Sequence, residues 1–264
     1  MAVADLQWAA AIYLIACLVA STGLVLRSRK LARAAVWLLA AGALLHGISF
    51  PLLHVQGQAP PLTSLAAAIS FMAWVGTLCF LGLLLRVRIA GLVVLVAPAA
   101  FLGVFLAALR LPAVDPATFA GTGSWPHAHV LLASAGLSLL GLAGLASLVF
   151  LFEHRRLKSK AAARRPFALP SLEALDRVNA TSLAAGFSLL TLGVVTGMLW
   201  VQTASGRPFG GTAHEAWSLV AWAVYAVLTA VRFGGRQGAR QAATGTVFAF
   251  GFLCFAVIGV ELLT

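Results

Sequence analysis

The sequence predicts an all-α, polytopic membrane protein with eight transmembrane helices and both termini on the outer side. Its 264 residues are 61% hydrophobic and only 9% charged, whereas about a quarter of the residues in a soluble domain are charged. The mean hydropathy of +0.99 indicates that lipid is the main solvent of the chain. The charges gather in short links between apolar runs, and each run is long enough to cross a bilayer as a helix.

Eight apolar runs define the expected spans, which together form a single membrane domain over residues 1–264. The spans cover about residues 8–26, 35–55, 62–85, 89–109, 126–152, 180–201, 214–231 and 242–263. Pro98 is expected to kink the fourth span. Before the sixth span, Leu172, Leu175 and Val178 fall on one helical face. This spacing predicts a short helix that lies along the membrane surface.

The placement of the basic residues predicts which links face the cytoplasm. The chain has 18 Lys and Arg and a formal net charge of +11. All of these residues except Arg110 and Arg207 lie in the links that follow the first, third, fifth and seventh spans. Cytoplasmic links carry an excess of Lys and Arg, so these four links are expected in the cytoplasm of a bacterial cell, with the chain in its inner membrane. The same placement accounts for the positive charge without nucleic acid as a partner.

The segment Trp125-Pro126-His127-Ala128-His129 places two of the six histidines at the outer end of the fifth span. Residues three or four apart share a helix face, so His129 shares one with Trp125 and His127 does not. We therefore expect His129 to be a cofactor ligand beside Trp125, and His127 to lie at the rim of the same site. The alternative is that these residues only form part of the interfacial belt of aromatic and amphipathic rings.

His46 lies near the middle of the second span, where an ionisable side chain is costly and indicates function by default. The alternative is a neutral imidazole that hydrogen-bonds a backbone carbonyl or a serine of a neighbouring helix. The only charged residues within the expected spans are Glu215 and Glu261, which lie within three residues of a span end, so the interior of every span is uncharged. That pattern argues against ion pumps and proton-coupled carriers, which place charges along their pathways.

His214 begins the seventh span next to Glu215, and Trp217 follows within one turn. We expect His214 and Trp217 to contribute to the same outer site, where Trp125 and Trp200 would complete an aromatic wall for a flat apolar ligand. The alternative for His214 is a polar helix start, at which the helix dipole favours Glu215. His54 and His154 are expected to be solvated helix ends.

One imidazole in the middle of a span and several outer ones, without a carboxylate cluster or a thiol pair, suit a soft metal ion or a haem. Haem iron takes axial histidine, and the porphyrin favours apolar and aromatic walls. A zinc site would need three or four converging ligands. His46 and His129 are therefore the candidate axial ligands, at two sites or at two ends of one path. The three cysteines form no C-x-x-C motif, so thiol–disulfide exchange is not expected.

The chain also resembles the cytochrome c assembly proteins of the CcsA/CcmC type, including the HemX-like branch, from His46 to the last helix. The motifs that carry this resemblance combine aromatic, glycine and leucine positions in the later spans. They are Pro61–Leu65, Ser70–Trp74, Trp125 with His129-Val130, Leu172–Asp176, Gly186-Phe187, Leu189–Gly193, Thr196–Trp200, Glu215–Trp217 and Ala221-Trp222.

The resemblance implies a membrane protein that binds haem b and passes or presents it at the outer face, with apocytochrome c and other assembly proteins as partners. It implies that His129 is an external haem ligand and His46 an intramembrane one. Ser205–Ala213 lacks the tryptophan-rich motif of the haem-attachment members, which favours the HemX-like branch. The protein is then at most one component of a haem-attachment system. Two alternatives are an accessory or regulatory protein of haem biosynthesis and a carrier of a small uncharged solute.

Overall fold

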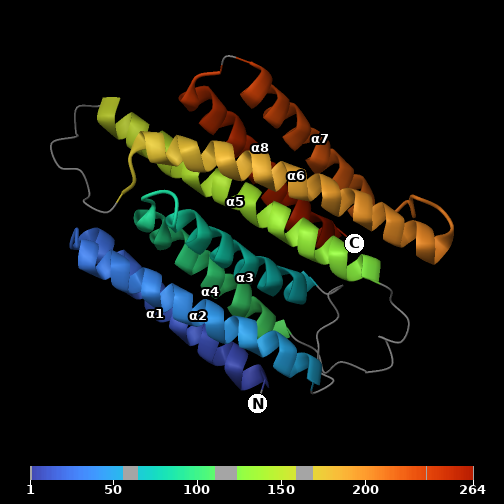
Figure 1. The fold of residues 1–264 in the computed structure, drawn as a ribbon, viewed down its shortest axis with the longest axis horizontal. Coiled ribbons are helices and arrows are strands. Elements are labelled where there is room, and N and C mark those ends of the chain that lie inside the picture. The colour runs from blue at the N-terminus through green and yellow to red at the C-terminus, as the bar shows by residue number, and fades with distance from the viewer. Residues whose placement is uncertain (1, 56–64, 111–123, 159–168, 236, 264) are drawn as a thin grey trace. The chain divides into compact units, whose positions relative to one another are not determined.

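The computed structural model describes residues 2–55, 65–110, 124–158, 169–235 and 237–263, and these residues are almost entirely helical (Figure 1). The elements in chain order are α1 (Ala2–Val25), α2 (Arg29–Val55), α3 (Leu65–Leu84), η1 (Ala90–Leu92), α4 (Val93–Arg110), α5 (Ser124–Lys158), α6 (Leu172–Ser205), α7 (Ala213–Gly234) and α8 (Ala239–Leu263). Helices satisfy their backbone hydrogen bonds internally, which is what a lipid solvent requires.

The all-helical, polytopic prediction is confirmed. Among the described residues, six helices are long and apolar enough to cross a membrane, and α3 contributes a shorter apolar stretch at Ala68–Leu84. Each of the eight expected spans coincides with one of the helices α1 to α8 over its described residues. The total of eight spans and the side of each terminus remain predictions.

Several helix boundaries differ from the sequence-based expectation, among them those of α5 and α6. The fifth span was expected to end at residue 152, but α5 continues through the basic residues to Lys158. The short surface helix predicted at Leu172–Val178 is instead the beginning of α6, which runs without interruption to Ser205. Leu175 and Val178 are fully buried. Their shared apolar face therefore packs against protein. A face of this kind has the same residue spacing as one that lies on a membrane surface, and the sequence alone does not distinguish the two.

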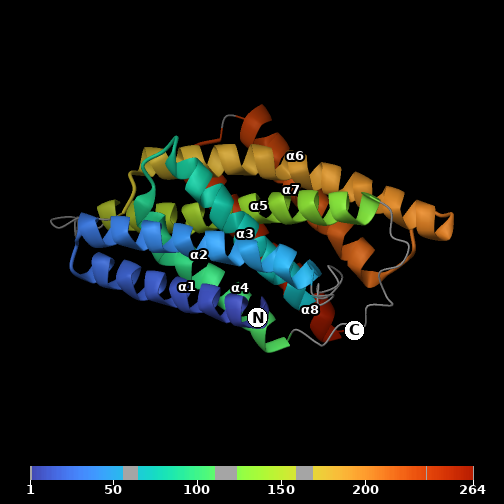
Figure 2. The same ribbon diagram turned by 60° about the horizontal axis from the view of Figure 1, so that its bottom comes forward.

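The described helices form two compact units, each with its own contacts. The N-terminal unit contains α1, α2, α3, η1 and α4. Within it α1 lies against α2 and α4, and α3 lies against α4 (Figure 2). Small residues permit this close packing: a Cβ added to Gly42 of α2 would lie 2.7 Å from the Tyr13 ring of α1. The Trp74 indole of α3 donates a hydrogen bond to the Ala43 carbonyl of α2 at 2.8 Å.

The C-terminal unit contains α5, α7, α8 and α6 from Leu175 onward. Its core is a cluster of buried side chains from all four helices: Leu140, Leu183, Leu190, Tyr225, Ala249 and Leu253. Polar contacts supplement this apolar core. The buried Asn179 amide of α6 donates to Ser147 of α5 at 2.8 Å and to Thr246 of α8 at 2.9 Å. Such hydrogen bonds fix the register of neighbouring helices where the surrounding lipid offers no driving force for association.

The α5–α6 crossing is the closest backbone approach that concerns the candidate site. A Cβ added to Gly136 of α5 would lie 2.6 Å from the Leu190 nitrogen and 3.0 Å from the Gly186 carbonyl of α6. A Cβ on Gly193 of α6 would likewise lie 3.0 Å from the Ala133 backbone. Glycine at these positions lets the two backbones meet, as small residues commonly do between membrane helices.

Candidate functional site

His129 is oriented by a hydrogen bond to α6. Its Nδ1 lies 2.8 Å from the carbonyl oxygen of Gly193. A carbonyl only accepts, so Nδ1 carries the proton and Nε2 keeps its lone pair. Within the described part of the chain, Nε2 has no hydrogen-bond partner. A histidine held through one nitrogen with the other nitrogen unprotonated is the usual arrangement of a metal-binding imidazole.

Glycine and tryptophan residues of α6 form the immediate surroundings of His129. A Cβ built on Gly197 would lie 2.8 Å from His129 Nδ1, so the ring rests directly on the helix backbone. The Trp200 ring lies 6.0 Å from the imidazole, centroid to centroid. Sequence reasoning named Trp200 as part of a possible wall but missed the positioning roles of Gly193 and Gly197. Their spacing of four residues, small-xxx-small, was the available signal.

Replacing Gly197 with alanine is expected to weaken binding at His129 about tenfold without removing the ligand. The added Cβ would meet the ring at 2.8 Å, which forces the imidazole away from the Gly193 carbonyl. Equilibrium titration of the purified protein with haem, followed by absorbance, measures the change. Gly251 offers a matched control, because a Cβ there meets nothing within 4 Å. Equal affinities for Gly197→Ala and Gly251→Ala would contradict the assigned role of Gly197.

The other predicted site residues lie at or near the helix ends but are not brought to His129 by any contact among the described residues. Trp125 is 42% exposed, and His127 and His214 are exposed. Trp217 packs against Phe252 and Phe255 of α8, with ring centroids 6.0 and 5.7 Å apart. The structure therefore gathers His129 with Trp200, Gly193 and Gly197, and leaves the remaining candidates as separate exposed or packed groups.

Glu215 organises the link that precedes His214. Its carboxylate accepts hydrogen bonds from the backbone nitrogens of Gly210 and Gly211 at 2.8 and 2.9 Å. Gly211 has a φ of +77°, which glycine adopts without strain. The Thr212 hydroxyl caps α7 by accepting from the Glu215 nitrogen at 3.3 Å. The polar helix start that sequence analysis offered as the alternative for this position is thus present.

Contacts within the C-terminal unit place His129 and Arg232 at opposite ends. The bond from His129 to Gly193 brings the beginning of α5 to the later part of α6, and α7 begins a few residues after α6 ends. At the other end, Arg232 donates to Asp176 at 2.8 Å, which joins the end of α7 to the beginning of α6. His129 and Trp200 therefore lie at one end of the unit, and the Arg232–Asp176 pair lies at the other.

His46 is enclosed by the N-terminal unit and is 0% exposed. Its Nε2 lies 3.0 Å from the Ser70 hydroxyl of α3, and its Nδ1 lies 3.5 Å from the Tyr13 hydroxyl of α1. The ring also stacks on Phe50, with centroids 5.1 Å apart. Both nitrogens thus face protein hydroxyls, and the role of His46 as a haem ligand remains a prediction. The arrangement matches the alternative in which a neutral imidazole hydrogen-bonds across helices.

Replacing His46 with alanine is expected to lower the free energy of unfolding by about 2 to 3 kcal/mol and to leave haem binding unchanged. The substitution removes the stacked ring and both hydroxyl contacts from a closed interior. Denaturant unfolding in detergent and a haem titration measure the two effects. His214→Ala is the control for stability, because His214 is exposed. A stable His46→Ala protein that no longer binds haem would instead establish His46 as a ligand.

No group of three or more His, Cys, Asp or Glu residues converges into a metal site within the described residues. Among the described histidines, His129 is the one with a ring nitrogen held by a protein carbonyl and the other nitrogen without a partner. A single histidine beside an aromatic ring suits a planar metal complex that brings most of its own ligands. Together, the fold and this site define a multi-pass helical membrane protein in which a backbone carbonyl of α6 orients a histidine near the beginning of α5.

The chain belongs to the cytochrome c assembly protein family, because the family model described as "Cytochrome C assembly protein" matches residues 62–264. The cytochrome c biogenesis protein CcsA of Prochlorococcus marinus is 27% identical over 234 residues, which cover 77% of this chain and 73% of the relative. CcsA of Chlamydomonas reinhardtii is 28% identical over 216 residues, covering 77% and 58%. CcsA of Synechococcus elongatus is 35% identical over 99 residues, covering 37% and 30%.

Membership in this family establishes a role in cytochrome c assembly for a multi-pass membrane protein, and confirms the resemblance inferred from the motifs. The matched residues include His129 and the α6 positions that hold it. His46 lies before residue 62, so it falls outside the family match.

Proposed function

We propose that this protein binds haem b at the end of its C-terminal unit and passes or presents it during cytochrome c assembly. The observation that carries the proposal is the His129 imidazole, whose Nδ1–H is held by the Gly193 carbonyl at 2.8 Å. That bond leaves Nε2 as the donor atom that an axial haem ligand requires. Trp200 supplies the aromatic neighbour.

The residues fit haem better than a bare metal ion. A porphyrin supplies four nitrogen ligands, so one protein imidazole is enough to fix the iron. The indole of Trp200 and the partly exposed Trp125 offer apolar surface for the ring. When bound, haem would be the group delivered to apocytochrome c. The chain's own residues would hold and orient the haem. The Gly193 carbonyl fixes the tautomer and orientation of the His129 imidazole, and the missing side chain of Gly197 leaves space for that imidazole.

In this proposal the chain crosses a bacterial inner membrane eight times, with both termini outside. The His129 end of the C-terminal unit then faces the outer side, where apocytochrome c would be met. Sixteen of the 18 Lys and Arg lie in links that this topology puts in the cytoplasm. Within the C-terminal unit, the separation of His129 from Arg232 supports the same orientation. The exposed His127 and His214 would lie at the rim of the site.

A visible absorption spectrum of the purified protein tests the proposal. We expect a Soret band as isolated or after addition of haem, with a saturable titration. The absence of a Soret band under both conditions would refute haem binding. A solute carrier would instead transport its substrate in liposomes without haem.

A further inference from the structure

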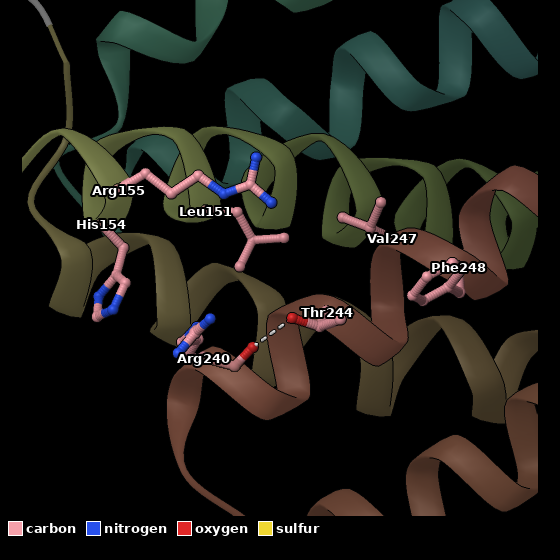
Figure 3. Close-up of a pocket in the computed structure, with 7 residues that line it drawn as sticks. All are labelled: Leu151, His154, Arg155, Arg240, Thr244, Val247 and Phe248. Atoms are coloured by element: carbon pink, nitrogen blue, oxygen red, sulfur yellow. Dashed lines mark hydrogen bonds between the residues drawn. The ribbon is translucent and has the colours of Figure 1, made fainter.

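A cavity opens between α5 and α8 at the basic end of the C-terminal unit. It has a volume of about 180 Å³. Its lining comes from two helices that are distant in sequence, as Figure 3 shows: Leu151, His154 and Arg155 of α5, and Arg240, Thr244, Val247 and Phe248 of α8. Nothing in the proposed haem site uses any of these residues, since His129 lies near the other end of α5.

The two guanidinium groups of the cavity lack protein partners. Neither Arg155 nor Arg240 makes an ion pair or a side-chain hydrogen bond within the described residues. Nearby arginines behave differently: Arg156 lies 3.8 Å from Glu153, and Arg232 lies 2.8 Å from Asp176. Among the described residues, the cavity therefore has two positive charges without an ion-pair partner beside an imidazole, and none of its described lining residues is a carboxylate. This electrostatic character favours an anionic ligand.

The cavity changes from charged to apolar along the helix axes. Leu151 is one turn inward from Arg155, about 6 Å along α5. Val247 and Phe248 lie about 11 Å inward from Arg240 along α8. Phe248 is 75% exposed, so the apolar part opens to the surroundings of the helix bundle rather than to its core. A ligand that fits must be anionic at one end and apolar at the other.

We propose that this cavity binds one anionic phospholipid of the leaflet that contacts the basic links. Its phosphate would lie between Arg155 and Arg240, with His154 beside it, and an acyl chain would lie along Leu151, Val247 and Phe248. One guanidinium group can donate two parallel hydrogen bonds to two oxygens of the same phosphate. Basic pockets between transmembrane helices are known to suit acidic lipid headgroups. The bound lipid would join α5 to α8 at the end remote from His129.

Native mass spectrometry of the full chain in neutral detergent tests the proposal. Dioleoyl phosphatidylglycerol and dioleoyl phosphatidylcholine are compared, because they share acyl chains and differ in headgroup charge. We expect tighter binding of phosphatidylglycerol. The double substitution Arg155→Gln/Arg240→Gln should reduce its affinity by about tenfold or more. The lysine variant Arg155→Lys/Arg240→Lys, which keeps both charges, should retain most of the binding.

The matched control is Arg86→Gln/Arg88→Gln, which removes the same charge from exposed residues of another basic link. It should change the affinity less than about twofold. Equal losses in the two glutamine variants would overturn the proposal in favour of general charge attraction. Equal binding of both lipids would also overturn it. If glycerol phosphate displaces phosphatidylglycerol at equal concentration, the ligand is a soluble phosphate and not a lipid. Should the double glutamine variant fail to fold, Arg240→Gln alone is expected to lower the affinity about threefold.

Discussion

Replacing His129 with alanine is expected to weaken haem binding by at least about a hundredfold and to remove the Soret band of the purified protein. Among the described histidines, only His129 has one ring nitrogen held by a protein carbonyl and the other nitrogen without a protein partner. Loss of a group that merely orients a ligand costs about 10- to 100-fold in metal affinity, so loss of the ligand should cost more. Haem titration followed by absorbance measures the effect.

His127→Ala is the matched control for this experiment. His127 lies two residues away on the same helix, is exposed, and does not share the face of His129. Its removal should change haem affinity by less than about twofold, within the range of a surface substitution. If His129→Ala binds haem as tightly as the unchanged protein, or if both variants lose binding equally, His129 is not the axial ligand.

Replacing Gly136 with alanine is expected to destabilise the protein by about 2 kcal/mol or more and to weaken haem binding as well. The new Cβ would lie 2.6 Å from the Leu190 nitrogen and 3.0 Å from the Gly186 oxygen, and both are backbone atoms. Backbone cannot rotate out of the way, so α5 and α6 must separate. Their separation would stretch the bond from His129 to Gly193, which crosses the same interface.

Gly251→Ala provides the comparison, because a Cβ at Gly251 of α8 meets nothing within 4 Å. Alanine is the better helix former by about 1 kcal/mol, so this variant should be neutral or slightly more stable. Thermal or denaturant unfolding in detergent, together with a haem titration, distinguishes the two glycines. A Gly136→Ala protein as stable as Gly251→Ala would show that the α5–α6 crossing tolerates a wider separation.

The positions of the helices were predictable because lipid imposes a simple rule on sequence. An apolar run must be helical and about as long as the bilayer is thick. The rule describes where a span leaves the hydrocarbon layer and not where the helix ends. It therefore missed the continuation of α5 to Lys158 and the early beginning of α6 at Leu172. Buried Leu175 and Val178 were misassigned to the membrane surface for the same reason.

The candidate site was predictable only in part. Helix periodicity separated His129 from His127, and the local geometry agrees with that choice. The partners of a histidine, however, depend on which helices are neighbours, and hydropathy does not encode this. Ser70 and Tyr13 around His46, and Gly193 beneath His129, could be found only from the packing of helices. The cavity lined by Arg155 and Arg240 was likewise not predictable from the sequence, because it depends on α5 and α8 being neighbours.

Rescue by free imidazole is the most direct test of the claim that His129 Nε2 is the axial donor to haem. Replacing His129 with glycine leaves a space of the shape of the lost side chain beside Gly193 and Gly197. The account predicts that His129→Gly lacks the Soret band of the unchanged protein and regains it when imidazole is added. A Soret band in His129→Gly that is unchanged in position and intensity, with or without imidazole, would contradict the account.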